Sequence, residues 1–363
     1  MKKNITLYLL IGSMFWSIPL IGQEVKYNIH FSQMFEQKKD ASPQLQEASV
    51  GLETFINAYS DSLFFNHDEI SPQLKTMYNQ LFFPPIKDSR YSHFYIVEGK
   101  VISSELCEFK IVTRQTIPEL NSDEILSIND VFVNKNKVDI GYRQRLEHYE
   151  KINVGSITYY VKDKRFFDWE EAQKAIFFCD KIKQLFNIKQ LPELHYILSK
   201  NEENPLMFFG FEYTWSPLVC YIKAENLLLS DNIGENYRHE LVHYVLQEYN
   251  LNEAVSEGLA VYMGGSGGKS FEEFVKETIE KHGNPSVEQI IEVLTVDKAS
   301  FNHFKYLYCL NAVCVEILYL EKGIAGLQSL LETKYQTLNM IQILEDVLDR
   351  PQQEIIAAII KNL

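Results

Sequence analysis

The amino-acid sequence predicts an α+β protein with a helical and antiparallel-β N-terminal region, followed by a small mixed sheet and a helical lobe. Two patterns support this fold class. Short β-branched and aromatic runs broken by Asn and Asp fill residues 93–140, which is typical of antiparallel strands. From about Gly234 onward, apolar residues recur at helical spacing, and Ser-x-x-Glu and Ser-x-x-Gln sequences mark helix starts. We therefore expect an N-terminal region at residues 23–150 and a second domain at residues 151–363.

The first 22 residues have the features of a secretory signal peptide. Lys2 and Lys3 precede an apolar stretch that ends at the small residue Gly22, and Pro19 interrupts that stretch. We expect cleavage near Gly22 and export of the mature chain to the periplasm, the cell envelope or the medium of a bacterium. The alternative is an uncleaved anchor, because the apolar run is nearly long enough to span a bilayer. Only in that case would a membrane be a partner.

The amino-acid composition limits the kinds of molecule that the protein is expected to bind. With 46% hydrophobic residues, the chain has enough apolar material for a core, so extensive disorder is excluded. The formal net charge is −14, and no stripe of Lys and Arg is present to follow a phosphate backbone, which argues against nucleic acid. The five cysteines contain no CxxC pair, and we expect Cys309 and Cys314 in the core.

Secondary-structure signals follow one another along the chain. Residues 24–85 are predicted to be helical up to the break at Pro84-Pro85, and a helix is predicted from Asp168 to Phe186. Separate strands are predicted in the N-terminal region at 93–102, 107–113, 124–130 and 131–140. Strands are predicted in the second domain at 155–161, 194–199, 207–213 and 218–224. The last of these is either an edge strand, on which an extended substrate can pair through its backbone, or an interior strand.

Residues 239–243, His-Glu-Leu-Val-His, form an HExxH sequence inside a predicted helix. Residues four apart project from one face of a helix, so His239 and His243 can bind one zinc ion while Glu240 lies beside it. Zinc lowers the pKa of a bound water from 15.7 to about 7, and a nearby carboxylate can take the proton as the oxygen attacks a carbonyl. The pattern predicts a zinc site with both histidines as ligands and Glu240 as general base.

A catalytic zinc usually takes a third protein ligand, and Glu253 and Glu257 both follow the motif. We expect the motif helix to extend to about residue 250 and a second, antiparallel helix to return through Tyr262. Glu257 then lies level with residue 245, about 6 Å closer to the histidines than Glu253 at 1.5 Å per residue. Spacing therefore favours Glu257. Glu253 stands in the first helical turn, where the helix dipole by itself favours a carboxylate.

Small residues follow the favoured ligand. Gly258 lies inside the helical pattern, where glycine costs about 1 kcal/mol relative to alanine, so a packing reason is expected. We predict that Gly258, together with Ala260, lets the second helix approach the motif helix closely.

HELVH followed by SEGLAVY resembles the gluzincin metallopeptidases, and the EGLAxY form is similar to their peptidase-MA-like branch. The resemblance covers residues 155–363 and implies a zincin-like peptidase domain in which Glu257 is the third zinc ligand. A second register stays open, because NEAVSE at 252–257 also resembles NEAISD of thermolysin. That register implies Glu253 as the ligand and Glu257 as a partner of a zinc histidine, although the gap of nine residues after His243 is shorter than in thermolysin.

The resemblance also implies a hydrogen-bond donor for the oxyanion of the reaction. Gluzincins often use a tyrosine or histidine beyond the third ligand for this purpose. The candidates here are His303, Tyr306 and Tyr308, and the family's spacing to a later glycine favours Tyr308 with Gly323. Packing in the core is the other role open to these tyrosines.

Together these patterns predict an exported zinc-dependent metallopeptidase that hydrolyses peptide bonds in a peptide or protein substrate. Two alternatives remain open: an envelope binding or scaffold protein with a structural zinc site, and a zinc hydrolase of a non-peptide amide or ester. Residues 23–150 carry no motif that we can place, so their role in recognising a substrate, shielding the site or docking a partner stays undetermined.

Overall fold

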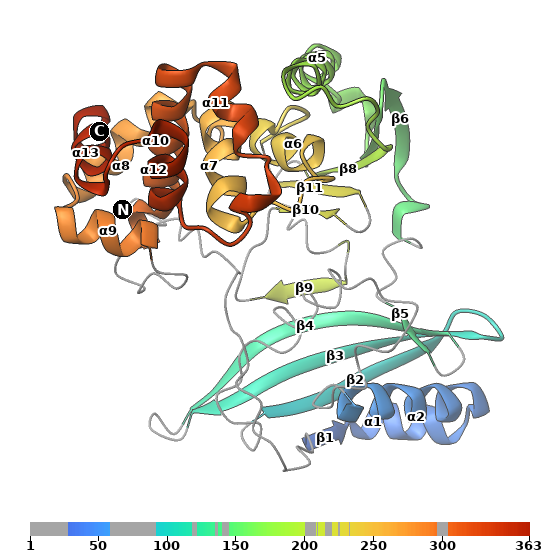
Figure 1. The fold of residues 1–363 in the computed structure, drawn as a ribbon. Coiled ribbons are helices and arrows are strands. Elements are labelled where there is room, and N and C mark those ends of the chain that lie inside the picture. The colour runs from blue at the N-terminus through green and yellow to red at the C-terminus, as the bar shows by residue number, and fades with distance from the viewer. Residues whose placement is uncertain are drawn as a thin grey trace, which may run out of the picture. The chain divides into compact units, whose positions relative to one another are not determined.

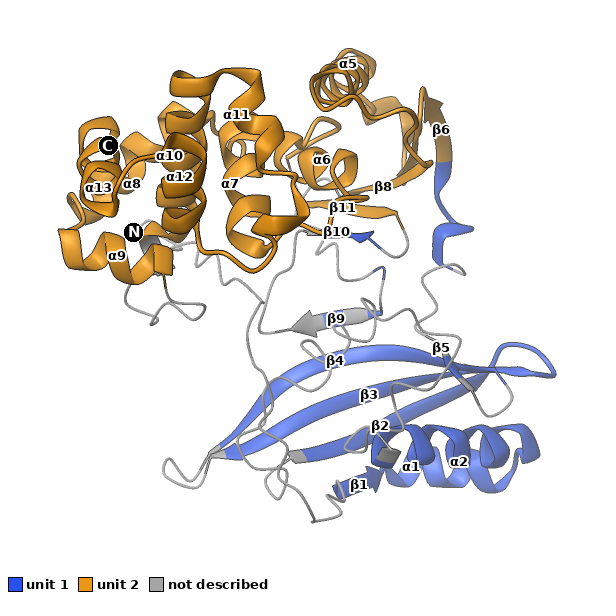
Figure 2. Ribbon diagram, in the orientation of Figure 1, with its two compact units in different colours: residues 1–150, 201–225 blue, residues 151–200, 226–363 orange. Residues whose placement is uncertain are grey.

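A computed structural model of the protein shows an α+β fold, which confirms the predicted fold class (Figure 1). The chain forms two compact units, residues 1–150 with 201–225 and residues 151–200 with 226–363 (Figure 2). The predicted second domain, 151–363, includes residues 201–225, whereas the first compact unit contains them. The structure describes residues 28–58, 92–117, 122–134, 137–139, 145–199, 208, 210–214, 220–223, 226–231, 233–295 and 304–363.

Several predictions fall outside these ranges. The signal peptide at 1–22, the Pro84-Pro85 break and His303 are among the residues that the structure does not describe. Among the helices that it does describe, none combines the length and the apolar character needed to cross a bilayer.

In the residues that the structure describes, the first unit contains two helices and a curved sheet. The sheet order is β1-β2-β3-β4-β5 with β9 paired to β4, and every pair except β1–β2 is antiparallel. Gly99 in β2 lies against the side chains of Phe35 and Leu45, so the helices pack on one face of the sheet. The elements are β1 (Asn28–Phe31), α1 (Gln33–Asp40), α2 (Pro43–Ala58), β2 (Ser92–Val101), β3 (Leu106–Ile117), β4 (Ser122–Asn134), β5 (Lys137–Asp139) and β9 (Phe211–Thr214).

One strand of this sheet differs from the prediction. The sequence predicts separate strands at 124–130 and 131–140, but β4 runs without a break through Asn129 and Asp130. The polar pair does not form a turn because the ladder with β3 continues across it, and Asp130 lies opposite Lys110 with an ion-pair distance of 4.0 Å. A cross-strand charge partner thus replaces the expected turn.

The second sheet has the order β10-β11-β8-β7-β6, and β8 runs parallel to both β7 and β11. Among the described strands β10 ends this order, so residues 220–222 of the strand predicted at 218–224 lie at an edge. The strands are β6 (Glu150–Val154), β7 (Ile157–Val161), β8 (Leu194–Ser199), β10 (Cys220–Ile222) and β11 (Leu227–Asp231). The helices of this part of the chain are α5 (Trp169–Leu185), α6 (Arg238–Val245), α7 (Glu253–Gly264), α8 (Phe271–His282), α9 (Val287–Thr295), α10 (Phe304–Lys322), α11 (Ile324–Ser329), α12 (Met340–Leu348) and α13 (Gln352–Asn362).

Local signals place several helix ends where the sequence predicts them. The Asp168 side chain accepts hydrogen bonds from two backbone N–H groups in the first turn of α5. Ser270 forms a capping box with Glu273 at the start of α8. Cys309 and Cys314 are buried in α10, as expected of core residues. Helix α7 packs against both α6 and α10, which places the segment that follows the HExxH motif inside the helical lobe.

Candidate metal site

The HExxH sequence lies on α6, whose apolar side holds the helix in place. Leu241 and Val245 are fully buried and form the inward face of the motif helix. The helix ends at Val245, earlier than the predicted end near residue 250. Beyond it, Gln247 and Tyr249 donate backbone hydrogen bonds to carbonyls three residues back, so the chain tightens into turns instead of continuing the helix.

The turns lead into α7, which begins at a well-defined cap. The Asn252 side chain accepts a hydrogen bond of 2.9 Å from the backbone N–H of Val255. Its amide group donates to the backbone carbonyls of Tyr335 and Leu338, at 2.8 and 2.9 Å. These contacts anchor the first turn of α7 and thereby fix the position of the following residues along the axis of α6.

Three side chains from the two helices meet. The Nε2 atoms of His239 and His243 lie 3.3 Å apart. The carboxylate of Glu257 approaches both, with distances of 3.3 Å to His239 Nε2 and 3.5 Å to His243 Nε2. Among the described residues, this is the group of His, Cys, Asp and Glu side chains whose arrangement can hold a metal ion. Glu253 is exposed in the first turn of α7 and is not part of the group.

The spacing of these atoms fits a tetrahedral metal. Donors that lie about 2.1 Å from a tetrahedral ion are separated from one another by about 3.4 Å. The separation of 3.3 Å between the two Nε2 atoms agrees with that value. Each histidine also has one Glu257 oxygen at a similar distance, Oε2 at 3.3 Å from His239 and Oε1 at 3.5 Å from His243. Two imidazole nitrogens and one carboxylate oxygen also leave a fourth position for another ligand, as in open metal sites.

Each imidazole has a hydrogen-bond partner at Nδ1, the ring nitrogen that does not face Glu257. His239 Nδ1 lies 2.9 Å from the backbone carbonyl oxygen of Gly265, and His243 Nδ1 lies 3.0 Å from Ser256 Oγ. A carbonyl oxygen can only accept, so His239 donates from Nδ1 and turns Nε2 toward Glu257. Neither Ser256 nor Gly265 is among the site residues predicted from the sequence. The position of Ser256 next to the predicted ligand Glu257 is a weak sequence signal for such a role. The partner at Gly265 is a backbone carbonyl, which no residue type in the sequence reveals.

The charges inside the site are coupled. Burial opposes a charge on His239, but its hydrogen bond to Glu257 and the charges of Glu240 and Glu257 outweigh burial and raise the pKa of His239 to about 9. Burial also disfavours the Glu257 carboxylate, but the charges and hydrogen bonds of the two histidines lower the pKa of Glu257 well below its usual range. The Glu257 carboxylate is therefore ionised, and His239 carries a hydrogen on both ring nitrogens. A divalent cation bound to Nε2 of His239 would displace the hydrogen from that nitrogen.

The predicted general base lies on the same helix as the two histidines. Glu240 is buried, with 7% of its surface exposed, and its charge acts on both His239 and Tyr308. The Glu240 carboxylate is thus shielded from solvent and close enough to His239 to act on its pKa.

Two of the three oxyanion candidates are described, and they differ in environment. The Tyr308 ring lies 6.5 Å from the His239 ring in an edge-on arrangement. Burial, followed by the charges of Glu257 and Glu253, raises the pKa of Tyr308 well above its usual value, so its hydroxyl keeps the proton. Tyr306 instead donates to backbone carbonyls at the end of α8 and is almost fully buried, which is a structural role.

The glycine that meets the motif helix is not the predicted one. A Cβ at Gly258 would lie 2.9 Å from the backbone oxygen of Asn311, so Gly258 allows close packing against α10 and the expectation that it faces α6 is wrong. Gly264 makes the contact with α6, because a Cβ there would lie 2.6 Å from the backbone of Arg238 and His239. Glu257 faces the histidines, and the next residue is rotated by about 100° around the helix.

The segment that enters α6 is fixed by side chains from other elements. The hydroxyl of Tyr196 in β8 donates to the carbonyl of Gly234 at 2.7 Å and accepts from the N–H of Tyr237 at 3.2 Å. The hydroxyl of Tyr159 in β7 donates to the carbonyl of Glu235 at 2.9 Å. These contacts substitute for a side-chain cap, which Tyr237 does not provide at the start of α6.

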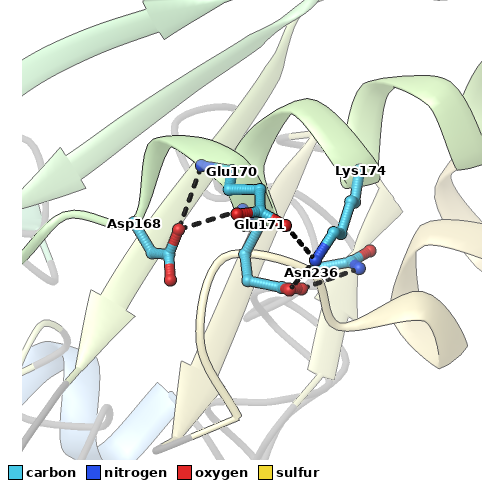
Figure 3. Close-up of polar contacts among 5 residues, drawn as sticks. All are labelled: Asp168, Glu170, Glu171, Lys174 and Asn236. Atoms are coloured by element: carbon cyan, nitrogen blue, oxygen red, sulfur yellow. Dashed lines mark hydrogen bonds and ion pairs between the residues drawn. The ribbon is translucent and has the colours of Figure 1, made fainter.

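The start of α5 adds a further polar anchor to this segment (Figure 3). The Asn236 amide donates to Glu171 at 3.1 Å, and the same carboxyl group contacts Lys174 at 2.8 Å (Figure 3). Asp168, which caps α5, also donates its own backbone N–H to the side chain of Glu235 at 2.8 Å. The entry to the motif helix is therefore held to the sheet and to α5.

No family model matches the chain, and no curated protein shows significant sequence similarity to it. The chemistry open to the site follows from the groups that it brings together. These are two imidazoles and a carboxylate around one point, a second buried carboxylate on the motif helix, and a protonated tyrosine nearby.

Proposed function

We propose that the protein is an exported zinc-dependent metallopeptidase. The observation that carries the proposal is the His239, His243 and Glu257 group, in which the two Nε2 atoms lie 3.3 Å apart and each has a Glu257 oxygen at 3.3 or 3.5 Å. Zinc is the metal we favour, because it takes imidazole and carboxylate ligands at about 2.0–2.2 Å in this geometry. The choice of a peptide as substrate is supported by the HELVH and SEGLAVY sequences, which resemble those of gluzincins.

The protein residues have separate roles in this proposal. Zinc, when bound, would lower the pKa of a water molecule and polarise the carbonyl group of the substrate. Glu240 takes up the proton of the attacking water and returns it to the leaving amine, which its buried position on α6 supports. Tyr308 keeps its proton and can donate a hydrogen bond to the developing oxyanion.

The outer hydrogen bonds support a catalytic site over a structural one. Both histidines are held through Nδ1, and the three protein donors leave one tetrahedral position free for water or substrate. A structural zinc site usually takes four protein ligands, and no fourth His, Cys, Asp or Glu belongs to this group among the described residues.

The test is peptide profiling by mass spectrometry with the mature protein and its Glu240→Gln variant. Wild type should generate new peptide termini, while the variant should bind the same amount of zinc and lose activity by at least about 10²-fold. Glu248→Gln is the matched control, because Glu248 lies exposed in the turn after α6. The Glu248→Gln variant should cleave peptides at the wild-type rate.

Two results would overturn the proposal. One is cleavage by Glu240→Gln at the wild-type rate, which would remove the assigned base. The other is a zinc-loaded wild-type protein that cuts no member of a diverse peptide mixture. A positive result in ester or non-peptide amide assays would then move the assignment to another class of hydrolase.

A further inference from the structure

His243 is held by a different kind of partner from His239. His239 Nδ1 faces a backbone carbonyl, which only accepts hydrogen bonds, so Nδ1 must carry a hydrogen. His243 Nδ1 faces the hydroxyl of Ser256, which both donates and accepts. The orientation of His243 thus depends on one neutral side chain that a single substitution can remove.

A bound metal would select one of the two arrangements of this pair. For Nε2 of His243 to donate its lone pair to a metal, the hydrogen of the neutral ring must sit on Nδ1. The Ser256 oxygen must then accept that hydrogen, at the observed separation of 3.0 Å. In this arrangement the hydroxyl holds the orientation of the ring without adding a charge to the site.

We propose that Ser256 is a positioning residue that orients His243 and thereby sets the affinity of the site for its metal. The inference rests on the proposed metal site, but not on the identity of the substrate. Ser256 directly precedes Glu257 on α7, and Gly265 directly follows the same helix. The third ligand and both outer partners therefore belong to one segment, 256–265, so its docking on α6 orients all three ligands together.

The experiment measures zinc affinity by competition with a chromophoric chelator, using full-length mature protein and no peptide substrate. Ser256→Ala should bind zinc about 10–100-fold more weakly than wild type, which is the usual effect of losing an outer hydrogen bond to a metal ligand. Ser329→Ala is the control, because Ser329 also donates a local hydrogen bond, to Gly326 in α11. Its affinity should match that of wild type.

Ser256→Thr and Ser256→Val form a second comparison, because the two side chains have nearly the same shape and differ by the hydroxyl group. Threonine should retain the wild-type affinity, whereas valine should show the loss expected for alanine. Spectra of the cobalt-loaded proteins report the coordination geometry directly, and the threonine protein should give the wild-type spectrum. Circular dichroism of the metal-free proteins establishes that each variant is folded.

The outcomes separate this inference from the proposed peptidase activity. Equal zinc affinity of the wild-type, alanine and valine proteins would overturn the role of Ser256, even if peptides are cleaved. The predicted order of affinities would support it, even if no peptide is cleaved. A threonine variant as weak as the valine variant would also contradict it, because the hydroxyl would then make no difference.

Discussion

Gly264 in α7 lies against the backbone of His239 in α6, at a separation that leaves no room for a side chain. A Cβ at position 264 would come within 2.6 Å of the His239 nitrogen. The last turn of α7 therefore packs on the first turn of the motif helix. The adjoining Gly265 carbonyl accepts the His239 Nδ1 hydrogen bond at 2.9 Å.

This contact predicts the effect of Gly264→Ala. The added methyl group should push the start of α6 away and lower the stability of the protein by about 1–3 kcal/mol, as overpacking usually does. Because His239 moves with that turn, zinc affinity should fall as well. Thermal unfolding and chelator competition measure the two effects. Unchanged zinc affinity in a folded variant would contradict the role of Gly264 in placing His239.

Gly267→Ala is the control for this prediction. Gly267 has a φ of +58°, so an alanine there is strained, but no atom lies within 4 Å of its Cβ position. The expected cost is about 1–2 kcal/mol from the backbone alone. Zinc affinity should stay at the wild-type value, because nothing presses on α6.

A second prediction compares the two glutamates of α7. Glu257→Gln removes the carboxylate that lies 3.3 Å from His239 and 3.5 Å from His243, so stoichiometric zinc binding should be lost. Glu253→Gln, one turn earlier and exposed, should retain zinc. Metal analysis after desalting decides between the two. The opposite pattern would restore the thermolysin-like register, in which Glu253 is the ligand.

A third prediction concerns the two tyrosines of α10. If Tyr308 supports the oxyanion, Tyr308→Phe should lower kcat by about 10²–10³-fold without loss of zinc. Tyr306→Phe should instead destabilise the protein by about 1 kcal/mol, because Tyr306 donates to backbone carbonyls at the end of α8. Its kcat should be unchanged. Equal kcat values for Tyr308→Phe and wild type would remove Tyr308 from the mechanism.

Features of the fold that depend on a few neighbouring residues could be predicted from the sequence. Asp168 and Ser270 cap helices as expected, because a cap is formed by residues within one turn. The two histidines of the HExxH motif converge for the same reason, since four residues along a helix return to the same face. Such patterns are local and do not depend on how the rest of the chain is folded.

Features set by distant partners could not be predicted. Asn129-Asp130 has the composition of a turn, but the ladder with β3 keeps it in a strand. Gly258 and Gly264 differ in partner because α7 lies between α6 and α10, and the sequence does not determine which side of α7 faces each neighbour. Residues 211–214 join β4 rather than the second sheet, which requires a pairing across more than 70 residues of sequence.

The last prediction is the pH dependence of Asp130 in the first unit. Burial raises the pKa of Asp130 to about 6, and the nearby charge of Lys110 only partly offsets this effect. Below the unfolded-state pKa of about 3.9, Asp130 is neutral in both the folded and the unfolded chain, and the fold has its full stability. As the pH rises through about 6, the group becomes charged in the folded chain as well, and by then this stability has been lost. Wild type should therefore lose stability relative to Asp130→Asn between pH 4 and pH 7.

Thermal unfolding of wild type, Asp130→Asn and Glu124→Gln at pH 4, 5, 6 and 7.5 measures this effect. Glu124 lies on the same strand but is exposed, so its substitution controls for the general effect of removing an acid. The difference in melting temperature between wild type and Asp130→Asn should change most between pH 4 and pH 6. It should then level off, because above pH 6 the carboxylate is ionised in both the folded and the unfolded chain. A difference that stays constant from pH 4 to pH 7.5 would show that burial does not perturb Asp130.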